Sequence, residues 1–133
     1  MASPAEDMLA LLDAEPSLGL TDGTNLFLDG FVENAPHKSV AVYDSGANSG
    51  PEFDQSTRLS RVQVTVRGDK GLYSPAYQLA DDIVAVLQAV ANHETGGLRY
   101  SGVQLLSGPN RMPKDREERP RVSCNFYMVR GGA

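Results

Sequence analysis

The sequence predicts an α+β fold in which a mixed, mostly antiparallel sheet of about five strands carries two helices on one face. Two patterns lead to this class. Apolar and polar residues alternate over several short stretches, and elsewhere apolar residues recur at three- and four-residue steps. These stretches follow one another in the order α-β-β-β-α-β-β, which groups the strands between helices. With 133 residues, the chain is expected to form a single domain over residues 1–133.

A first helix is expected immediately after Ser3. The Ser3 hydroxyl is suited to accept a hydrogen bond from the first turn, Pro4 fits the first helical position, and Glu6 completes a capping box. The apolar stripe of this helix consists of Met8, Leu9, Leu11 and Leu12. Pro16 is expected to end the helix.

Two strands are expected next, over residues 25–33 and 38–44. Gly30 inside the first of them indicates a bulge or a bend. Residues 45–57 then form a polar stretch rich in Gly, Ser, Asn and Pro. Because a loop of this length is uncommon inside a small domain, the stretch is expected to be either functional or disordered until a partner binds it.

The clearest strand pattern covers residues 60–66. Val62, Val64 and Val66 fall on one face of the predicted strand. The opposite, polar face carries Arg61, Gln63, Thr65 and Arg67. This alternation is typical of a sheet that is covered on one side and solvated on the other.

A second helix is expected after the turn at residues 68–71, with Ser74 as its cap and Pro75 at its first position. Its apolar stripe consists of Leu79, Ile83, Leu87 and Val90. The helix is expected to end within residues 92–97, where two glycines favour a helix C-terminus. A fourth strand is predicted over residues 98–106.

The last part of the chain is predicted to contain a loop and a strand. Residues 107–120 are rich in charged side chains and hold three prolines, so a continuous helix is excluded. Residues 120–130 alternate as a final strand. Cys124 belongs to the apolar set of this strand, and its thiol is therefore expected to be buried rather than reactive.

Charge is distributed unevenly along the chain. The formal net charge of −5 argues against a general nucleic-acid binder. Residues 1–57 contain ten acidic side chains and a single basic one, whereas residues 58–133 contain eleven basic side chains and seven acidic ones. This polarity fits two arrangements: copies of the chain that meet acidic region to basic region, or halves that interleave so that the charge averages out.

No arrangement of residues indicates an active site, and the chain is expected not to be an enzyme. His37 and His93 lack nearby ligand residues, so neither a metal nor a cofactor is expected. The Gly68–Gly71 turn precedes a helix, where anions bind, but no established phosphate-binding pattern is present. No apolar run reaches the roughly 20 residues of a membrane span, and no signal peptide is evident.

Two segments carry a family resemblance. The strand RVQVTVR at 61–67, followed by a turn, Tyr77 and the helix ending QLADDIVAVLQ, resembles the central part of the minor capsid and tail terminator proteins of long-tailed bacteriophages. The closing run RPRVSCNFYMVR is similar to the end of many of these proteins. The resemblance extends from about the first helix to Arg130, and the motifs in it are strand and helix patterns without a catalytic signature.

The resemblance implies a homo-oligomeric ring, typically a hexamer, at the head-proximal end of the tail tube. Such a ring would stop polymerisation of the tail tube protein, join the tail to the head's connector protein, and let DNA pass through its lumen without specific binding. It would reside in the virion, and in the host cytoplasm during assembly. The residues expected to make subunit or partner contacts are Phe53, Asp54, Arg58, Arg61, Arg67, Arg111, Lys114, Arg116 and Arg119.

Two other functions fit the sequence alone. One is a small anion- or nucleotide-binding domain that uses the Gly68–Gly71 turn. The other is a monomeric adaptor whose loops fold onto another protein. The polar strand face of Arg61, Gln63, Thr65 and Arg67 is expected to form either a subunit seam or a lumen lining.

Overall fold

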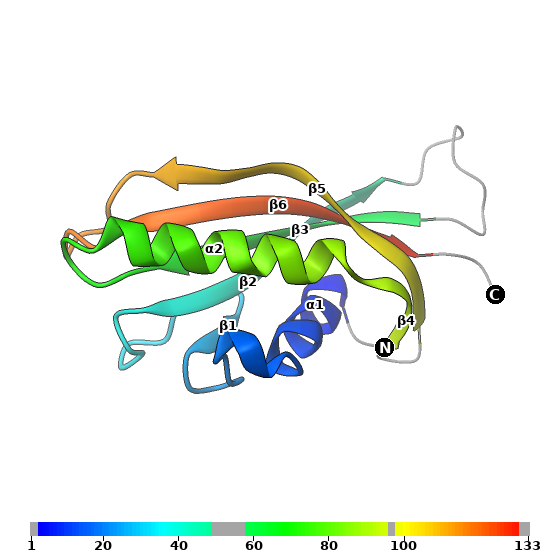
Figure 1. The fold of residues 1–133 in the computed structure, drawn as a ribbon, viewed down its shortest axis with the longest axis horizontal. Helices are drawn as coiled ribbons and strands as arrows, with labels where there is room; N and C mark the ends of the chain where they lie inside the picture. The colour runs from blue at the N-terminus through cyan, green and yellow to red at the C-terminus, as the bar shows by residue number, and fades with distance from the viewer. Residues whose placement is uncertain (1–2, 49–57, 96–97, 131–133) are drawn as a thin grey trace.

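A computed structural model describes residues 3–48, 58–95 and 98–130 and contains one six-stranded sheet and two α-helices (Figure 1). The strand order is β1-β2-β3-β6-β5-β4. β1 is parallel to β2, and the other neighbouring strands are antiparallel. The elements are α1 (Pro4–Asp13), the short 3₁₀ helix η1 (Pro16–Leu18), β1 (Leu26–Leu28), β2 (Ser39–Asn48), β3 (Arg58–Arg67), α2 (Tyr73–Gln88), β4 (Ala91–Thr95), β5 (Leu98–Met112) and β6 (Arg121–Arg130). The predicted α+β class is confirmed, with six strands in place of about five.

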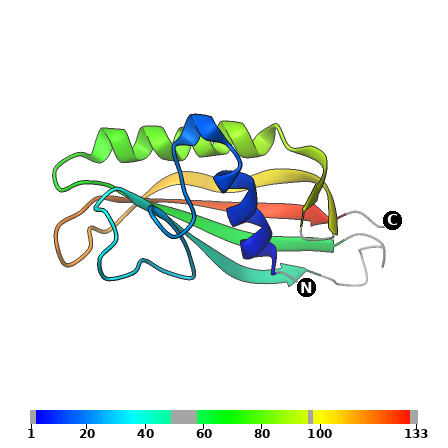
Figure 2. The ribbon, with the colours of Figure 1, turned by 90° about the horizontal axis from the view of Figure 1, so that it is seen from below.

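Both helices cover the same face of the sheet. Their apolar stripes and the valines of β3 belong to one hydrophobic core, whose members include Met8 and Leu12 of α1, Ile83 and Leu87 of α2, and Val62, Val64 and Val66. Figure 2 shows α2 lying along the sheet and the shorter α1 beside it. No helix among the described residues covers the other face of the sheet.

The N-terminal helix begins as predicted. The Ser3 side chain accepts a hydrogen bond from the Glu6 amide at 3.2 Å, and Pro4 is the first helical residue. The helix ends at Asp13, before Pro16, which instead opens η1. This small difference arises because proline is tolerated at a helix start but not in its interior.

The first two strands differ in length from the prediction. β1 covers only Leu26–Leu28, since the backbone bends at Asp29 and Gly30, which have φ values of 61° and 137°. The bend is as predicted, but the strand does not continue to residue 33. β2 passes through an irregularity after Asp44 and extends to Asn48, so the first residues of the predicted 45–57 loop are strand. Residues 49–57 lie outside the described structure.

The start of α2 corrects the predicted Ser74 cap. The helix begins at Tyr73, with Leu72 at the capping position and no side-chain cap. The turn before it is tight. A Cβ at Gly68 would lie 2.8 Å from the Cβ of Ala76, and the Gly68 amide donates to the Pro120 carbonyl at 2.9 Å. Gly68 is therefore explained by close packing of the helix start.

The segment predicted as the end of the second helix is partly a strand. α2 ends at Gln88, and β4 begins at Ala91. β4 pairs with β5 through His93 opposite Tyr100 and Glu94 opposite Arg99. A strand forms here because β5 offers a free edge, which the local sequence does not reveal.

β5 is longer than the predicted strand at 98–106. Asn110, Arg111 and Met112 pair with β6, so the first part of the predicted 107–120 loop is strand. Pro109 lies at a register shift between Ser107 and Asn110. A proline at such an irregularity removes no ladder hydrogen bond, which explains why the strand continues through it.

The last strand, β6, is confirmed. Val122, Cys124, Phe126 and Met128 face the core, and Cys124 is 1% exposed. Burial, and then the charge of Asp81, raise the pKa of the Cys124 thiol to about 12. Within the described residues, no helix is long and apolar enough to cross a membrane.

Candidate functional site

The helix-free face of the sheet is polar and partly open. Its central positions pair across β3 and β6, with Arg61 opposite Tyr127, Gln63 opposite Asn125 and Thr65 opposite Ser123. Arg61 is exposed, whereas Thr65 is buried. The alternation along β3 therefore predicted correctly which face its polar residues lie on. Only part of that face is accessible to solvent.

One end of this face contains a pocket of about 250 Å³. It lies where the β1–β2 connection and the β5–β6 connection approach the sheet, and it is lined by Phe31, Tyr43, Gln63, Thr65, Arg67, Met112, Asp115 and Arg121. Burial first, and then the charge of Asp29, raise the pKa of Tyr43, although Arg121 and Arg67 act in the opposite direction. The pocket thus combines two guanidinium groups with one phenol.

Arg67 holds the β1–β2 connection against the sheet. Its Nε donates to the His37 carbonyl at 2.9 Å, and its Nη2 donates to the Pro36 carbonyl at 2.7 Å. The guanidinium carbon lies 4.3 Å from the centre of the Phe31 ring. Burial, followed by the charge of Arg119, lowers the pKa of Arg67. These contacts engage two of the five N–H groups of Arg67 and one face of its guanidinium within its own chain.

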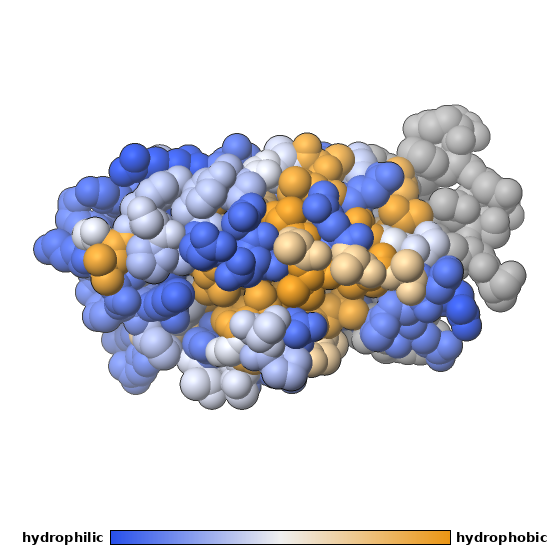
Figure 3. Space-filling model, viewed as in Figure 1, coloured by the Kyte–Doolittle hydropathy of each residue, from blue (hydrophilic) through white to orange (hydrophobic). Residues whose placement is uncertain are grey.

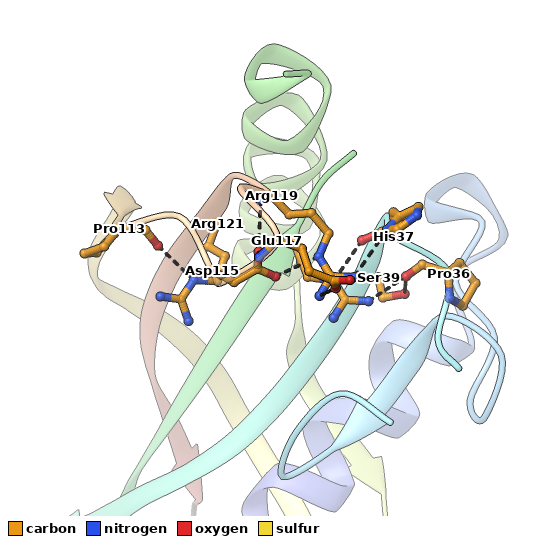
Figure 4. Close-up of polar contacts among 9 residues, drawn as sticks. Pro36, His37, Ser39, Pro113, Asp115, Glu117, Arg119 and Arg121 are labelled. Carbon is orange, nitrogen blue, oxygen red and sulfur yellow. Dashed lines mark hydrogen bonds and ion pairs between the residues drawn. The ribbon is translucent and has the colours of Figure 1, made fainter. Parts of the chain in front are cut away.

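Arg119 links the β5–β6 connection to the β1–β2 connection (Figure 4). Its guanidinium forms ion pairs with Asp115 at 2.7 Å and with Glu117 at 2.5 Å, and its Nη1 lies 3.2 Å from the His37 Nδ1. Asp115 also accepts from the backbone amides of Glu117 and Arg119. Partial burial raises the pKa of Asp115, but these hydrogen bonds outweigh it and the pKa is lowered. Residues 113–120 are therefore a folded turn.

Two further arginines stabilise the same end of the molecule. The Arg111 guanidinium carbon lies 4.7 Å from the centre of the Tyr73 ring, which joins the end of β5 to the start of α2. Arg121 Nε donates to the Pro113 carbonyl at 2.9 Å. Lys114 and Arg116 are exposed on the turn between them.

The predicted contact residues therefore fall into four groups. Arg61, Arg111, Lys114 and Arg116 are exposed, whereas Arg67 and Arg119 are largely occupied by contacts within the chain. The Arg58 backbone pairs with Arg130 in the sheet. Phe53 and Asp54 lie outside the described residues. None of these positions has been tested as an interface, and all nine remain predictions.

Tyr43 and Arg121 were not among the predicted site residues. Tyr43 follows Val42, which faces the core together with Val40, and this alternation along β2 is the signal that places the Tyr43 ring on the helix-free face. Arg121 follows the last proline of the turn and pairs with Arg67 across the sheet. Only the tertiary fold shows that both side chains border one pocket.

The described part of the chain shows little that suggests catalysis. It contains no group of three or more His, Cys, Asp or Glu residues placed to hold a metal ion. The Gly68 amide, which the anion-cradle interpretation would use, donates to Pro120. Cys124 lies in the core, where its raised pKa keeps the thiol protonated.

Comparisons with known proteins agree with the fold. The family model described as "Bacteriophage tail terminator protein" matches residues 16–130. A solved chain from the "Virion of native gene transfer agent (GTA) particle" is similar with a TM-score of 0.68 at 15% sequence identity, covering 98% of this chain and 96% of that chain. At this identity, the likeness concerns the fold alone. No curated protein matches the sequence.

The family match extends from η1 to the last residue of β6, and it therefore includes α2 and all six strands of the sheet. It also includes the two segments, 61–88 and 119–130, on which the sequence resemblance rests. Because the match spans most of the chain, this protein belongs to the bacteriophage tail terminator family.

Proposed function

We propose that this protein forms a ring, a homo-hexamer as the family resemblance implies, at the head-proximal end of the phage tail tube. There it stops polymerisation of the tube protein and provides the surface on which the head's connector docks. The single observation that supports this most strongly is membership of the tail terminator family, whose proteins are structural components of the phage tail.

The distribution of charge in the fold supports a contact between copies. β1 and β2, which belong to the acidic part of the sequence, form one edge of the sheet, and β5 and β4 form the opposite edge. The strands of the acidic part of the sequence thus lie at one edge of the sheet, although α1 also contacts β4 and Arg119 also contacts His37. In a head-to-tail ring, each subunit would present its acidic edge to a basic surface of the next.

The helix-free face of the sheet suits a lumen lining. Its open centre is formed by the neutral side chains of Gln63 and Asn125, with Arg61 as the exposed charge near them. The guanidinium of Arg67 is engaged by backbone carbonyls. DNA that must slide through a ring requires few accessible cations, because each phosphate contact adds to binding. On this proposal, DNA passes without specific binding.

The experiment is a polymerisation assay with the purified tail tube protein. Tubes are grown in the presence of increasing amounts of this protein, and their lengths are measured by electron microscopy. We expect that a molar excess over tube ends shortens the tubes and that one end of each tube carries extra density. Tube protein alone serves as the control. An unchanged length distribution at high excess would contradict the function.

A further inference from the structure

An apolar groove lies between α1 and α2 on the helix-covered side. Its volume is about 320 Å³, and its lining includes Leu11, Glu15, Val86, Ala89, Val90 and His93. Figure 3 shows apolar surface gathered over this part of the molecule, where α2 runs beside α1. The groove belongs to neither the pocket nor the polar face described above.

An aromatic patch lies at the other end of α2. Leu72 is 50% exposed and Tyr77 is 40% exposed. The Tyr73 and Tyr77 rings lie 5.9 Å apart, and Arg111 stacks on Tyr73. Tyrosine and arginine are the residues that most often dominate binding energy at interfaces, and the mutual contacts here hold these side chains in place before binding.

The groove and the patch lie on opposite flanks of one helix. Tyr77 and Val86 are nine positions apart. At 3.6 residues per turn, this separation rotates the side chain by about two and a half turns and moves it about 13 Å along the axis. The patch cannot reach the groove of its own chain. A neighbouring copy can supply it, and each copy then keeps one free patch and one free groove, as a closed ring requires.

The charges beside the two surfaces are complementary. Glu15 lines the groove, and the chain has no Lys or Arg before Lys38, so the α1 side of the groove is acidic. Arg111 stacks on the patch, and the exposed Lys70 lies in the turn directly before α2. Opposite charges around an apolar centre favour one orientation of docking and disfavour contacts of groove with groove or patch with patch.

We propose that the aromatic patch of Leu72, Tyr73 and Tyr77 on one copy docks into the α1–α2 groove of the next copy. The occupant of the groove is therefore a second copy of this chain, and Arg111 faces the acidic α1 side. This inference rests on the proposed ring and names the surfaces that build it.

The test uses one variant of each surface and a shared control position. Tyr77→Glu places a charge in the patch, and Ala89→Arg places a bulky cation in the groove. Arginine at the end of α2 is favourable for the helix, so folding is expected to be retained. Ala85 is exposed on the same helix and does not line the groove or the patch, so Ala85→Glu and Ala85→Arg are the matched controls. Leu72→Glu replaces Tyr77→Glu if that variant does not fold.

Assembly is measured by native mass spectrometry, with and without tail tube protein. We expect both surface variants to need at least a tenfold higher concentration for assembly, whereas the controls assemble like the wild type. A mixture of Tyr77→Glu and Ala89→Arg should form a dimer with one copy of each, because one variant retains its groove and the other its patch. That dimer should not grow into a ring.

Three results would overturn the docking. Rings formed equally well by both surface variants would refute these surfaces and leave the ring function standing. Surface variants that stay monomeric when mixed would show that patch and groove are not partners, although a ring exists. A wild-type protein that stays monomeric even with tube protein would refute the ring function and this interface together.

Discussion

At the scale of single residues, Arg67 shows how far a strand pattern can be interpreted. Alternation along β3 correctly predicted that Arg67 shares a face with Arg61. It could not predict that the β1–β2 connection would cover Arg67 and leave it 5% exposed, because that depends on a bend at Asp29 and Gly30 far away in the sequence. A charged residue on a polar face can thus stabilise the fold of its own chain rather than bind a partner.

Replacing Arg67 by methionine is expected to lower the free energy of unfolding by about 2–4 kcal/mol. The substitution removes the Arg67 donor from the carbonyl of His37, leaves the Pro36 carbonyl with the Ser39 hydroxyl alone, and removes the cation from Phe31. Urea denaturation measures the loss. Arg61→Met is the control, and it should change stability by less than about 0.5 kcal/mol because Arg61 is exposed. Equal losses in the two variants would contradict the structural role of Arg67.

Cys124 is expected to resist alkylation in the folded protein. Since its pKa is raised from 9.0 to about 12, the thiolate fraction at pH 8 falls about a thousandfold, and burial further blocks access. Mass spectrometry after iodoacetamide treatment should show no adduct in native buffer and one adduct in concentrated urea. Fast stoichiometric labelling of the native protein would mean that β6 does not face Cys124 inward.

At the scale of elements, the sequence identified the strongly periodic segments and missed those formed by tertiary pairing. β3 and β6 have alternating valines or other apolar residues and were predicted almost to their ends. β4, with the sequence ANHET, has no such pattern and exists because it completes the edge of β5. The start of α2 was misplaced because Leu72 carries no side-chain cap, so the local sequence offers no signal there.

The turn at 113–120 makes a pH-dependent contribution to stability. Its Asp115 has a lowered pKa in the folded protein, so its stabilisation is fully present above the ordinary value of 3.8 and is lost as the pH falls through the folded value. We expect Asp115→Asn to destabilise the protein by about 1–2 kcal/mol at pH 7 and by much less at low pH.

Urea titrations of wild type and Asp115→Asn across the acid range check this dependence. The matched control is Glu118→Gln, since the exposed Glu118 lies on the same turn outside the Arg119 ion pairs. A stability difference between Asp115→Asn and wild type that stays constant down to the most acidic pH would show that Asp115 acts through packing and not through its charge.

At the scale of the whole molecule, the order of the strands in the sheet determines which parts of the sequence lie at each edge. β1 and β2, from the acidic part of the sequence, lie at one edge of the sheet, and β5 and β4, from the basic part, lie at the other. The helices leave one polar face free, and α2 presents an aromatic patch and an apolar groove on opposite flanks. The groove could not be foreseen, because Val86 lies outside the predicted apolar stripe and α1 is distant in sequence.

The most direct test of the central claim is electron microscopy of the purified protein, imaged at micromolar concentration alone and with tail tube protein. Our account predicts closed rings with a uniform number of subunits, free or seated on one end of each tube. Single subunits in both samples, with bare tube ends, would contradict it.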